Sequence, residues 1–168
     1  MQSVINTGKK TWKQWILLAL LIVWMGMIFF FSAKPAVQSA QMSHSVGRMI
    51  GKLLVPEFDE LEEQEQDSFA ESIDFVVRKS AHACEYAVLG ILLFWNYEQK
   101  IRKRSILAGI SWLSVVAYAA TDEIHQLFVP GRSGQISDVM LDSFGGLLGV
   151  VFSVMIQYLI RKRKKDGS

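Results

Sequence analysis

The sequence holds little that would support disulfide or standard hydrolase chemistry. Cys84 is the only cysteine, so no disulfide can form within the chain. Because Cys84 falls inside an apolar run, we expect it to pack against neighbouring helices, with a catalytic thiol as the alternative. No Gly-x-Ser-x-Gly or His-Glu-x-x-His motif is present, so the sequence does not indicate a standard serine hydrolase or zinc protease. The chain also lacks an internal repeat.

Apolar residues make up 51% of the 168 residues and are concentrated in four blocks. About 20 apolar residues cross a membrane as a helix, so the blocks predict an all-α fold, a four-helix transmembrane bundle in a single domain covering 1–168. The second block is the least apolar, because Glu85 lies near its start. We expect the first block to be retained rather than cleaved as a signal peptide, because its apolar run is longer than a usual signal core. The predicted helices are 13–32, 68–97, 105–126 and 137–160, followed by a basic cytoplasmic tail over 161–168.

The segment between the first two predicted helices contains apolar residues at helical spacing. They predict a short amphipathic helix that is capped by Ser43 or Ser45 and ends near Pro56. This helix either lies on the outer membrane surface or packs over the mouth of the bundle. The acidic stretch 57–67 is predicted to be a solvated linker, with Asp67 as the cap of the next helix. The apolar residues are Val46, Met49, Ile50, Leu53 and Leu54.

Basic residues are distributed asymmetrically along the chain. Twelve of the 18 lie before the first block, between the second and third, or after the fourth. By the positive-inside rule, both termini and the 98–104 loop are expected in the cytoplasm, and 33–80 and 122–138 outside. The alternation of basic and acidic segments supports four spans. A basic tail could also indicate nucleic-acid binding, but a stop-transfer anchor explains it better, and we expect no nucleic-acid partner.

The fourth predicted helix carries a face of small residues. Gly145, Gly146 and Gly149 lie on that face. The spacing of the first and last of these glycines allows a neighbouring helix to approach closely. We therefore expect this face to have a structural role.

Polar side chains gather where three predicted helices reach the outer membrane boundary. One face of the second helix carries a cation, an imidazole and a phenol. The last turn of the third helix and the first turns of the fourth add carboxylates, a second imidazole and an amide. Charge at the end of a span is costly and usually has a use, so we expect one site at the outer face. The candidates are Lys79, His82, Glu85, Tyr86, Asp122, Glu123, His125, Gln126, Arg132, Ser133, Asp138 and Asp142.

Two stretches, RKSAHACEYAVLG from 78 and TDEIHQLFVPGRSGQISDVMLDSFGGLLG from 121, resemble the VanZ-like family of bacterial membrane proteins. The resemblance covers most of 15–158. It implies a multi-pass protein of the bacterial cell membrane and an association with glycopeptide (teicoplanin) resistance. Asp142 stands where the family often has Asn, so no role that requires a neutral amide is implied there. The residues that match the family pattern are Lys79, His82, Asp122, Glu123, Gln126, Arg132 and Asp138.

Three interpretations of the polar residues remain open. In the first, the site binds an anionic cell-envelope lipid, a peptidoglycan precursor or a glycopeptide. In the second, it is an outer-leaflet hydrolase or transferase acting on phosphate or acyl groups, with Arg132 and Lys79 holding the anion. In the third, ion pairs only lock the helix ends, although burying charge seldom stabilises by itself. The catalytic candidates are His82 as acid or base, Asp122, Glu123 and Asp138.

A metal ion is not expected at this site. The histidines and carboxylates offer nitrogen and oxygen ligands, but Lys79 and Arg132 already balance the carboxylate charge. We expect no cofactor. The expected partners are membrane lipids together with the lipid-linked precursor or glycopeptide named above, and the oligomeric state is left open.

Overall fold

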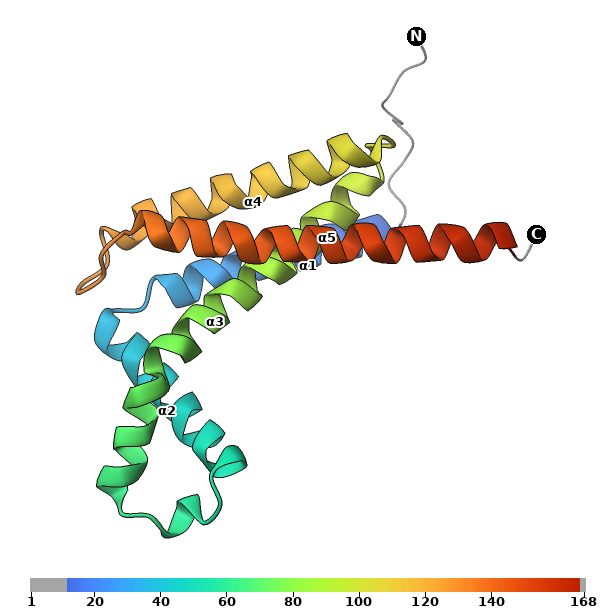
Figure 1. Ribbon diagram of the computed structural model, residues 1–168. Coiled ribbons are helices and arrows are strands. Elements are labelled where there is room, and N and C mark those ends of the chain that lie inside the picture. The colour runs from blue at the N-terminus through green and yellow to red at the C-terminus, as the bar shows by residue number, and fades with distance from the viewer. Residues whose placement is uncertain (1–11, 167–168) are drawn as a thin grey trace.

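The computed structural model describes residues 12–166, and over that range the chain is all helical (Figure 1). A single 3-10 turn, η1 (Phe58–Glu60), lies between the second and third α-helices. The helices are α1 (Trp12–Ser32), α2 (Ala36–Leu54), α3 (Glu63–Glu98), α4 (Arg104–Gln126) and α5 (Ile136–Asp166). The all-α prediction is therefore confirmed for the described residues.

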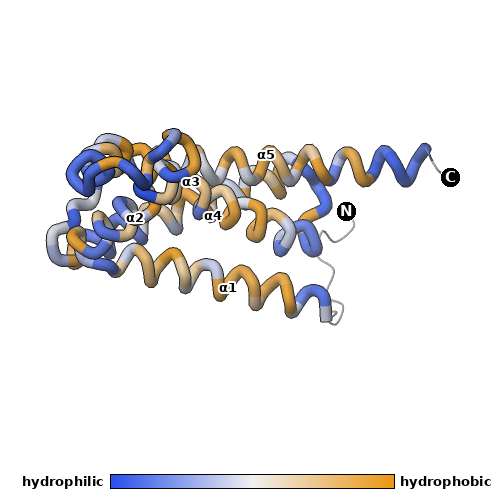
Figure 2. Tube along the Cα trace, turned by 90° about the horizontal axis from the view of Figure 1, so that it is seen from below, coloured by the Kyte–Doolittle hydropathy of each residue, from blue (hydrophilic) through white to orange (hydrophobic). Residues whose placement is uncertain are grey.

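Three of these helices, α1, α4 and α5, are long and apolar enough to cross a membrane. Figure 2 shows the apolar character running along most of α1 and through the middle of α5. The predicted second span, 68–97, falls inside α3 and is not among the three, so the predicted four-helix transmembrane bundle is not confirmed. The physical reason is composition: α3 begins with acidic residues and carries Lys79, His82 and Glu85 further along.

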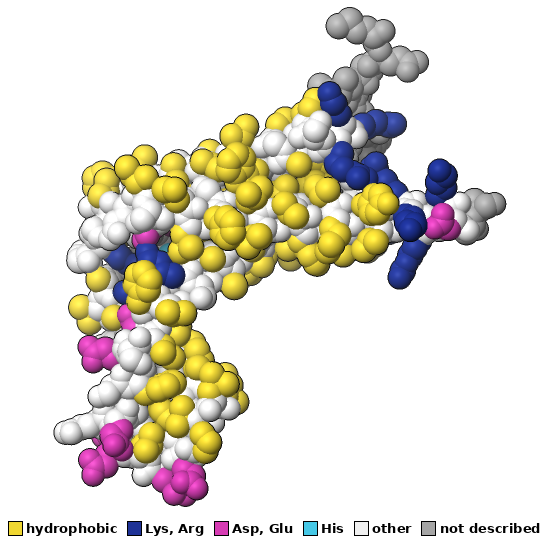
Figure 3. Space-filling view, viewed as in Figure 1, with side chains coloured by type: hydrophobic (Ala, Val, Ile, Leu, Met, Phe, Trp, Pro, Cys, Tyr) yellow, Lys and Arg dark blue, Asp and Glu magenta, His cyan; other side chains and the backbone are white. Residues whose placement is uncertain are grey.

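The helices form a bundle and an arm (Figure 1). In the bundle, α4 packs against α5, and the C-terminal part of α3 packs against α1, α4 and α5. The arm, residues 36–77, consists of α2, η1 and the first part of α3, and it projects from one end of the bundle. Figure 3 shows Lys and Arg side chains at the opposite end of the bundle and acidic side chains toward the tip of the arm. The charge asymmetry of the sequence is thus also an asymmetry in space.

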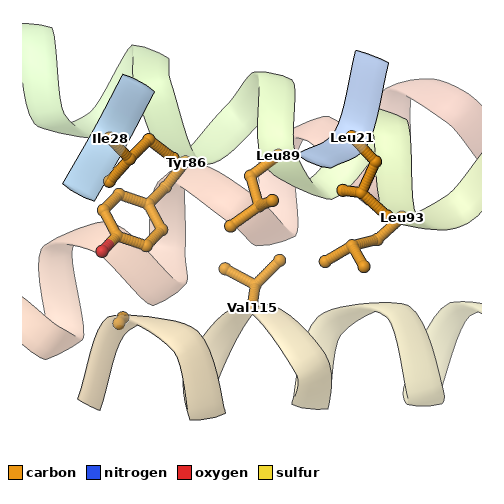
Figure 4. Packing of buried hydrophobic residues seen from close by; sticks show 7 residues of the cluster. Leu21, Ile28, Tyr86, Leu89, Leu93 and Val115 are labelled. Carbon is orange, nitrogen blue, oxygen red and sulfur yellow. The ribbon is translucent and has the colours of Figure 1, made fainter. Parts of the chain in front are cut away.

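The bundle is held by close contact of small residues and by a buried apolar cluster. A Cβ added at Gly145 or Gly149 would collide with the backbone of Ala83 or Ala87 on α3. The predicted structural role of the glycine face is therefore confirmed, and such contacts stabilise helix pairs in lipid because the backbones approach closely. The buried cluster lies between α1, α3 and α4 (Figure 4) and includes Leu21, Ile28, Tyr86, Leu89, Leu93 and Val115.

Aromatic donors add specific links between the helices of the bundle. Tyr118 donates its hydroxyl to the Met25 carbonyl oxygen at 2.7 Å, which ties α4 to α1. Trp112 Nε1 donates to the Ser143 carbonyl oxygen at 3.0 Å, which ties α4 to α5. In a membrane each such bond satisfies a polar group that lipid could not satisfy. The links set the rotation of α4 against its neighbours.

The beginning of the arm differs from the prediction. Helix α2 begins at Ala36, directly after Pro35, so neither Ser43 nor Ser45 caps it. Ser45 Oγ donates instead to the Gln41 carbonyl oxygen at 2.8 Å, and Ser43 Oγ lies between the carbonyl oxygens of the preceding turn and the Asp74 carboxylate of α3. The sequence pattern missed the first two turns because their large apolar residues, Val37 and Met42, do not repeat at helical spacing.

The acidic stretch after α2 is not a solvated linker. Phe58 is only 2% exposed, covers Gly51 of α2 and stacks edge-to-face on Phe69 with the ring centroids 5.5 Å apart. Helix α3 begins at Glu63, four residues before the predicted cap at Asp67. Acidic residues are favourable in the first turn of a helix, where the backbone N–H groups are unpaired. One buried aromatic ring therefore orders a segment whose composition indicates a loop.

Two further expectations need correction. Helix α5 continues through the basic residues to Asp166, so 161–166 is helical rather than a separate tail, and 167–168 lie outside the described residues. Cationic side chains in a last turn interact favourably with the unpaired carbonyl groups there. Cys84 is exposed, so it does not pack in the interior as expected.

Candidate functional site

The predicted site residues converge where the arm joins the bundle. Figure 3 shows basic and acidic side chains close together at this corner. The turn after α4 is tied to the turn after α1, because Ala36 N donates to the Pro130 carbonyl oxygen at 3.2 Å. Gly131 adopts φ 73° in that turn, a conformation that glycine accepts without strain. Residues from four helices are thereby held at one end of the bundle.

Asp122 lies at the centre of a buried network between α1 and α4. Its Oδ2 accepts from Ser32 Oγ at 2.8 Å and from Gln126 Nε2 at 3.3 Å. The same amide nitrogen lies 2.9 Å from Ser32 Oγ. All three side chains are at most 3% exposed. A hydrogen-bonded buried carboxylate of this kind fixes the positions of the helices that carry it.

Glu123 and Asp138 connect the start of α5 to the other helices. Glu123 Oε2 accepts from the backbone N–H of Gln135 at 2.9 Å, just before α5 begins. The Asp138 carboxylate pairs with the Lys79 ammonium of α3. Both contacts satisfy charged groups that burial would otherwise penalise. They hold the start of α5 at the site, and they occupy two of the carboxylates that the sequence predicts as catalytic candidates.

His82 and Glu85 form a looser pair on α3. His82 Nδ1 lies 3.9 Å from Glu85 Oε2, beyond hydrogen-bonding distance. The backbone carbonyl oxygen of Glu85 accepts from Trp24 Nε1 at 2.9 Å, which fixes this turn of α3 against α1. The imidazole is therefore placed by the helix rather than by a carboxylate.

Arg132 enters the corner from the turn between α4 and α5. Its Nε donates to the Lys34 carbonyl oxygen at 3.2 Å, and this is its only side-chain hydrogen bond within residues 12–166. No carboxylate of the described chain lies within ion-pairing distance of it. Burial lowers the pKa of Arg132, the neighbouring Arg78 lowers it further, and Asp122 with other carboxylates opposes both effects. Guanidinium pKa values are so high that Arg132 remains charged.

Buried polar atoms without a hydrogen-bond partner are concentrated at this end of the bundle. Such atoms normally find a partner, and each one left alone costs about 1–3 kcal/mol. Their concentration distinguishes this region from the apolar cluster below it. It also gives the site unused hydrogen-bonding capacity for a polar ligand. Among the described residues the atoms are His82 Nδ1, Tyr86 OH, Asp122 Oδ1, His125 Nδ1, Asp142 Oδ1 and Ser143 Oγ.

Three of the predicted residues are also held by other contacts, although Tyr86 OH and His125 Nδ1 have no hydrogen-bond partner among the described residues. Tyr86 is fully buried and its ring belongs to the apolar cluster (Figure 4). Ser133 is exposed and its Oγ accepts from Gln135 Nε2 at 3.1 Å. His125 lies against Phe29, with ring centroids 4.3 Å apart. Within the described part of the chain no three His, Cys, Asp or Glu residues are placed to hold a metal ion.

Sequence reasoning missed three polar residues that the structure brings to this corner. Ser32 bonds Asp122, Lys34 contacts Arg132 through its carbonyl oxygen, and Arg78 pairs with Asp74 at 3.1 Å. One signal was present: Lys34 is the first charge after the longest uncharged run. Ser32 carried no such signal, because a serine at the end of an apolar run is common.

A cavity of about 620 Å³ opens beside the corner, between α2, α3 and the end of α1. Most of its lining side chains are apolar. Lys34, Arg78, His82 and Glu85 contribute the charged part of the lining, and the exposed Cys84 also borders it. The candidate site and the cavity therefore share His82 and Glu85.

Comparison with known protein families gives a match to a family model described as VanZ/LLP1, over residues 17–157. The matched region includes every candidate residue and most of the chain. No curated protein and no solved structure matches the chain.

Proposed function

This chain belongs to the VanZ-like family, and from that premise we propose that it is a four-span membrane protein binding an anionic group at the extracytoplasmic face. The group belongs to a cell-envelope lipid, a peptidoglycan precursor or a glycopeptide. The proposal rests on the hydrogen bonding and burial of Arg132. A half-buried guanidinium held only through Nε keeps its other N–H groups for a bidentate anion.

The arrangement of the helices supports the fourth span. The start of α5 and the end of α4 meet the end of α1 at the corner, whereas α4 begins at the opposite end of the bundle (Figure 1). Helix α3 must therefore travel the length of the bundle to reach α4. A span packed inside a bundle tolerates polar residues that face its neighbours rather than lipid. We accordingly propose that about 81–98 crosses the membrane.

The positions of the charges support the proposed orientation. Basic side chains gather at the end of the bundle where α5 finishes, and acidic side chains at the tip of the arm (Figure 3). Clusters of Lys and Arg favour the cytoplasmic side. The proposal therefore puts both termini in the cytoplasm and the corner with its arm outside, and it treats the whole chain as one domain.

The geometry supports binding over the two other interpretations. Nothing in the geometry of the described residues favours catalysis by His82, because its Nδ1 lies 3.9 Å from Glu85 Oε2, beyond hydrogen-bonding distance, and no carboxylate there orients the ring. Locking of helix ends accounts for Asp122, Glu123 and the Lys79–Asp138 pair, since each has a structural partner. It does not account for Arg132, which has no anionic partner within the described residues.

The test compares arginine variants at two places. Arg132→Ala is expected to abolish any envelope or drug-resistance phenotype that the protein confers, while the protein accumulates in the membrane at its normal level. Arg132→Lys keeps the charge but loses the planar fork, so it should weaken the phenotype clearly. His82→Ala is expected to resemble Arg132→Ala. Arg102→Ala and Arg102→Lys, in the exposed turn before α4, are the matched controls and should change nothing.

Two results would contradict the proposal. Loss of Arg132→Ala from the membrane would show that this arginine only holds the bundle together. Normal insertion with a full phenotype would show that the functional site lies elsewhere.

A further inference from the structure

The cavity beside the corner has the size and lining of a ligand site. Its volume of about 620 Å³ falls within the roughly 300–1,000 Å³ typical of small-molecule sites. Its apolar walls come from both helices of the arm. They include Met42, Val46 and Ile50 of α2 and Ile73, Val76 and Val77 of α3.

Two cationic side chains, Lys34 and Arg78, line the charged end of the cavity, whereas Glu85 is the one carboxylate among the lining residues. Arg78 pairs with Asp74 at 3.1 Å, and His82 faces Glu85. The Lys34 ammonium forms no ion pair within the described residues, and it lies 4.2 Å from the centroid of the Phe30 ring. A ligand that matches this end is therefore anionic.

The surroundings of the cavity are apolar as well. Phe75 is 63% exposed and Val76 61% exposed on α3, and Met49 is 63% exposed on α2. Figure 3 shows hydrophobic side chains along the side of the arm that is turned toward the basic end of the bundle. An exposed apolar surface of this kind on an amphipathic helix lies against lipid. The cavity is thus within reach of lipid chains.

We propose that this cavity binds one hydrocarbon chain of an anionic membrane lipid, with the lipid phosphate held by Arg132 together with Lys34 and Arg78. The inference rests on the proposed function, because Arg132 is bonded to the Lys34 backbone and so lies at the same end of the cavity. It assigns the proposed anionic group to a lipid. A peptide is disfavoured because apolar walls offer its backbone N–H and C=O groups few partners.

Cys84 provides the probe, because it is the only cysteine in the chain, is exposed and borders the cavity. The full chain is labelled at Cys84 with bimane and placed in bilayers of phosphatidylcholine. Brominated phosphatidylglycerol or brominated phosphatidylcholine is then added, since bromine quenches bimane on contact. We expect phosphatidylglycerol to quench at a several-fold lower mole fraction than phosphatidylcholine.

Variants of the protein test separately whether the cavity binds the hydrocarbon chain of the lipid and whether it binds the headgroup. Lys34→Gln should remove the preference for phosphatidylglycerol while leaving quenching at high lipid fraction. Val77→Phe should reduce quenching by both lipids, because the added ring fills the cavity. Leu113→Phe, at a residue 60% exposed on α4, is the matched control and should leave quenching unchanged. Melting temperatures in detergent show that each variant is folded.

The inference would be overturned if the two lipids quench equally and Lys34→Gln does not change this. The quenching would then come from the ordinary lipid that surrounds the protein. Absence of quenching would overturn the inference as well. If the Arg132 variants lose the phenotype but Cys84 shows no lipid preference, only the lipid inference fails. If Cys84 shows the preference but the Arg132 variants keep the phenotype, the lipid site stands and the proposed function fails.

Discussion

Lys79 and Asp138 form an ion pair between side chains 59 residues apart, joining α3 to α5 where the arm meets the bundle. Each side chain is 24% exposed, so the pair is neither a surface pair nor a fully buried one. It sets the spacing of two helices, and both residues lie within the matched family region. It also neutralises a cation that the sequence alone assigned to anion binding.

Removing either partner should destabilise the fold. Lys79→Ala and Asp138→Ala should each lower the free energy of unfolding by about 1–3 kcal/mol, because the remaining charge loses its partner. The double variant should lose less than the sum of the two, with a coupling energy of at least about 0.5 kcal/mol. Unfolding in SDS measures these changes. Lys52→Ala, which breaks the more exposed pair with Asp59, is the control, with a loss of at most about 1 kcal/mol.

The contact of α5 with α3 should tolerate no added volume at Gly149. Gly149→Leu is expected to prevent folding in detergent, because even a Cβ would collide with the Ala87 carbonyl group. Overpacking a tight contact usually costs about 1–3 kcal/mol, and here backbone rather than a flexible side chain would have to move. Gly109→Leu is the control, since no heavy atom of another helix lies within 4 Å of its Cβ position. Equal melting temperatures for the two variants would contradict the tight contact.

Asp142 is the carboxylate whose replacement should improve stability. It is 1% exposed and its Oδ1 has no hydrogen-bond partner. Asp142→Asn keeps the shape and removes the cost of burying an ionisable carboxyl near Asp122 and Glu123, so the free energy of unfolding should rise by about 1–3 kcal/mol. Asp122→Asn should instead lower it, because Ser32 and Gln126 both bond to that carboxylate. A lower melting temperature for Asp142→Asn would show that the charge is used.

The proposed orientation can be checked by labelling single cysteines in a Cys84→Ser background. A membrane-impermeant maleimide added outside should label Glu62→Cys in the arm and miss Lys100→Cys in the turn between α3 and α4. The reason is that α3 must cross the membrane between these two positions. Disruption of the cells should then expose Lys100→Cys, which serves as the reactivity control. Labelling of both positions from outside would contradict the proposed fourth span.

Much of the helical content followed from local pattern. The predicted helix 13–32 is observed as Trp12–Ser32 and the predicted 105–126 as Arg104–Gln126. Uncharged runs and flanking basic residues define such helices without any knowledge of their neighbours. The close contact at the glycine face could also be predicted from local pattern, because close approach of a helix needs small residues at a fixed spacing.

The structure of the arm could not be predicted from local sequence pattern. Its start at Ala36 follows from Pro35, and its order around η1 follows from one buried ring, Phe58. Both depend on contacts that composition does not express. The polar residues show the same contrast. The motif pattern selected Asp122 and Arg132, but a single sequence cannot tell that Ser32 satisfies the first and that the second has no carboxylate partner among the described residues.

The sequence by itself determined that the chain is helical, that apolar segments suited to a membrane alternate with charged ones, and which polar residues stand at their ends. Those properties depend on residue type and spacing along one helix at a time. Only the tertiary structure decided which polar groups are partnered, which remain free, and that a cavity opens between α2 and α3. The physical reason is that hydrogen bonds, ion pairs and cavities depend on distances between helices, which arise from packing and are not encoded in the period of any one of them.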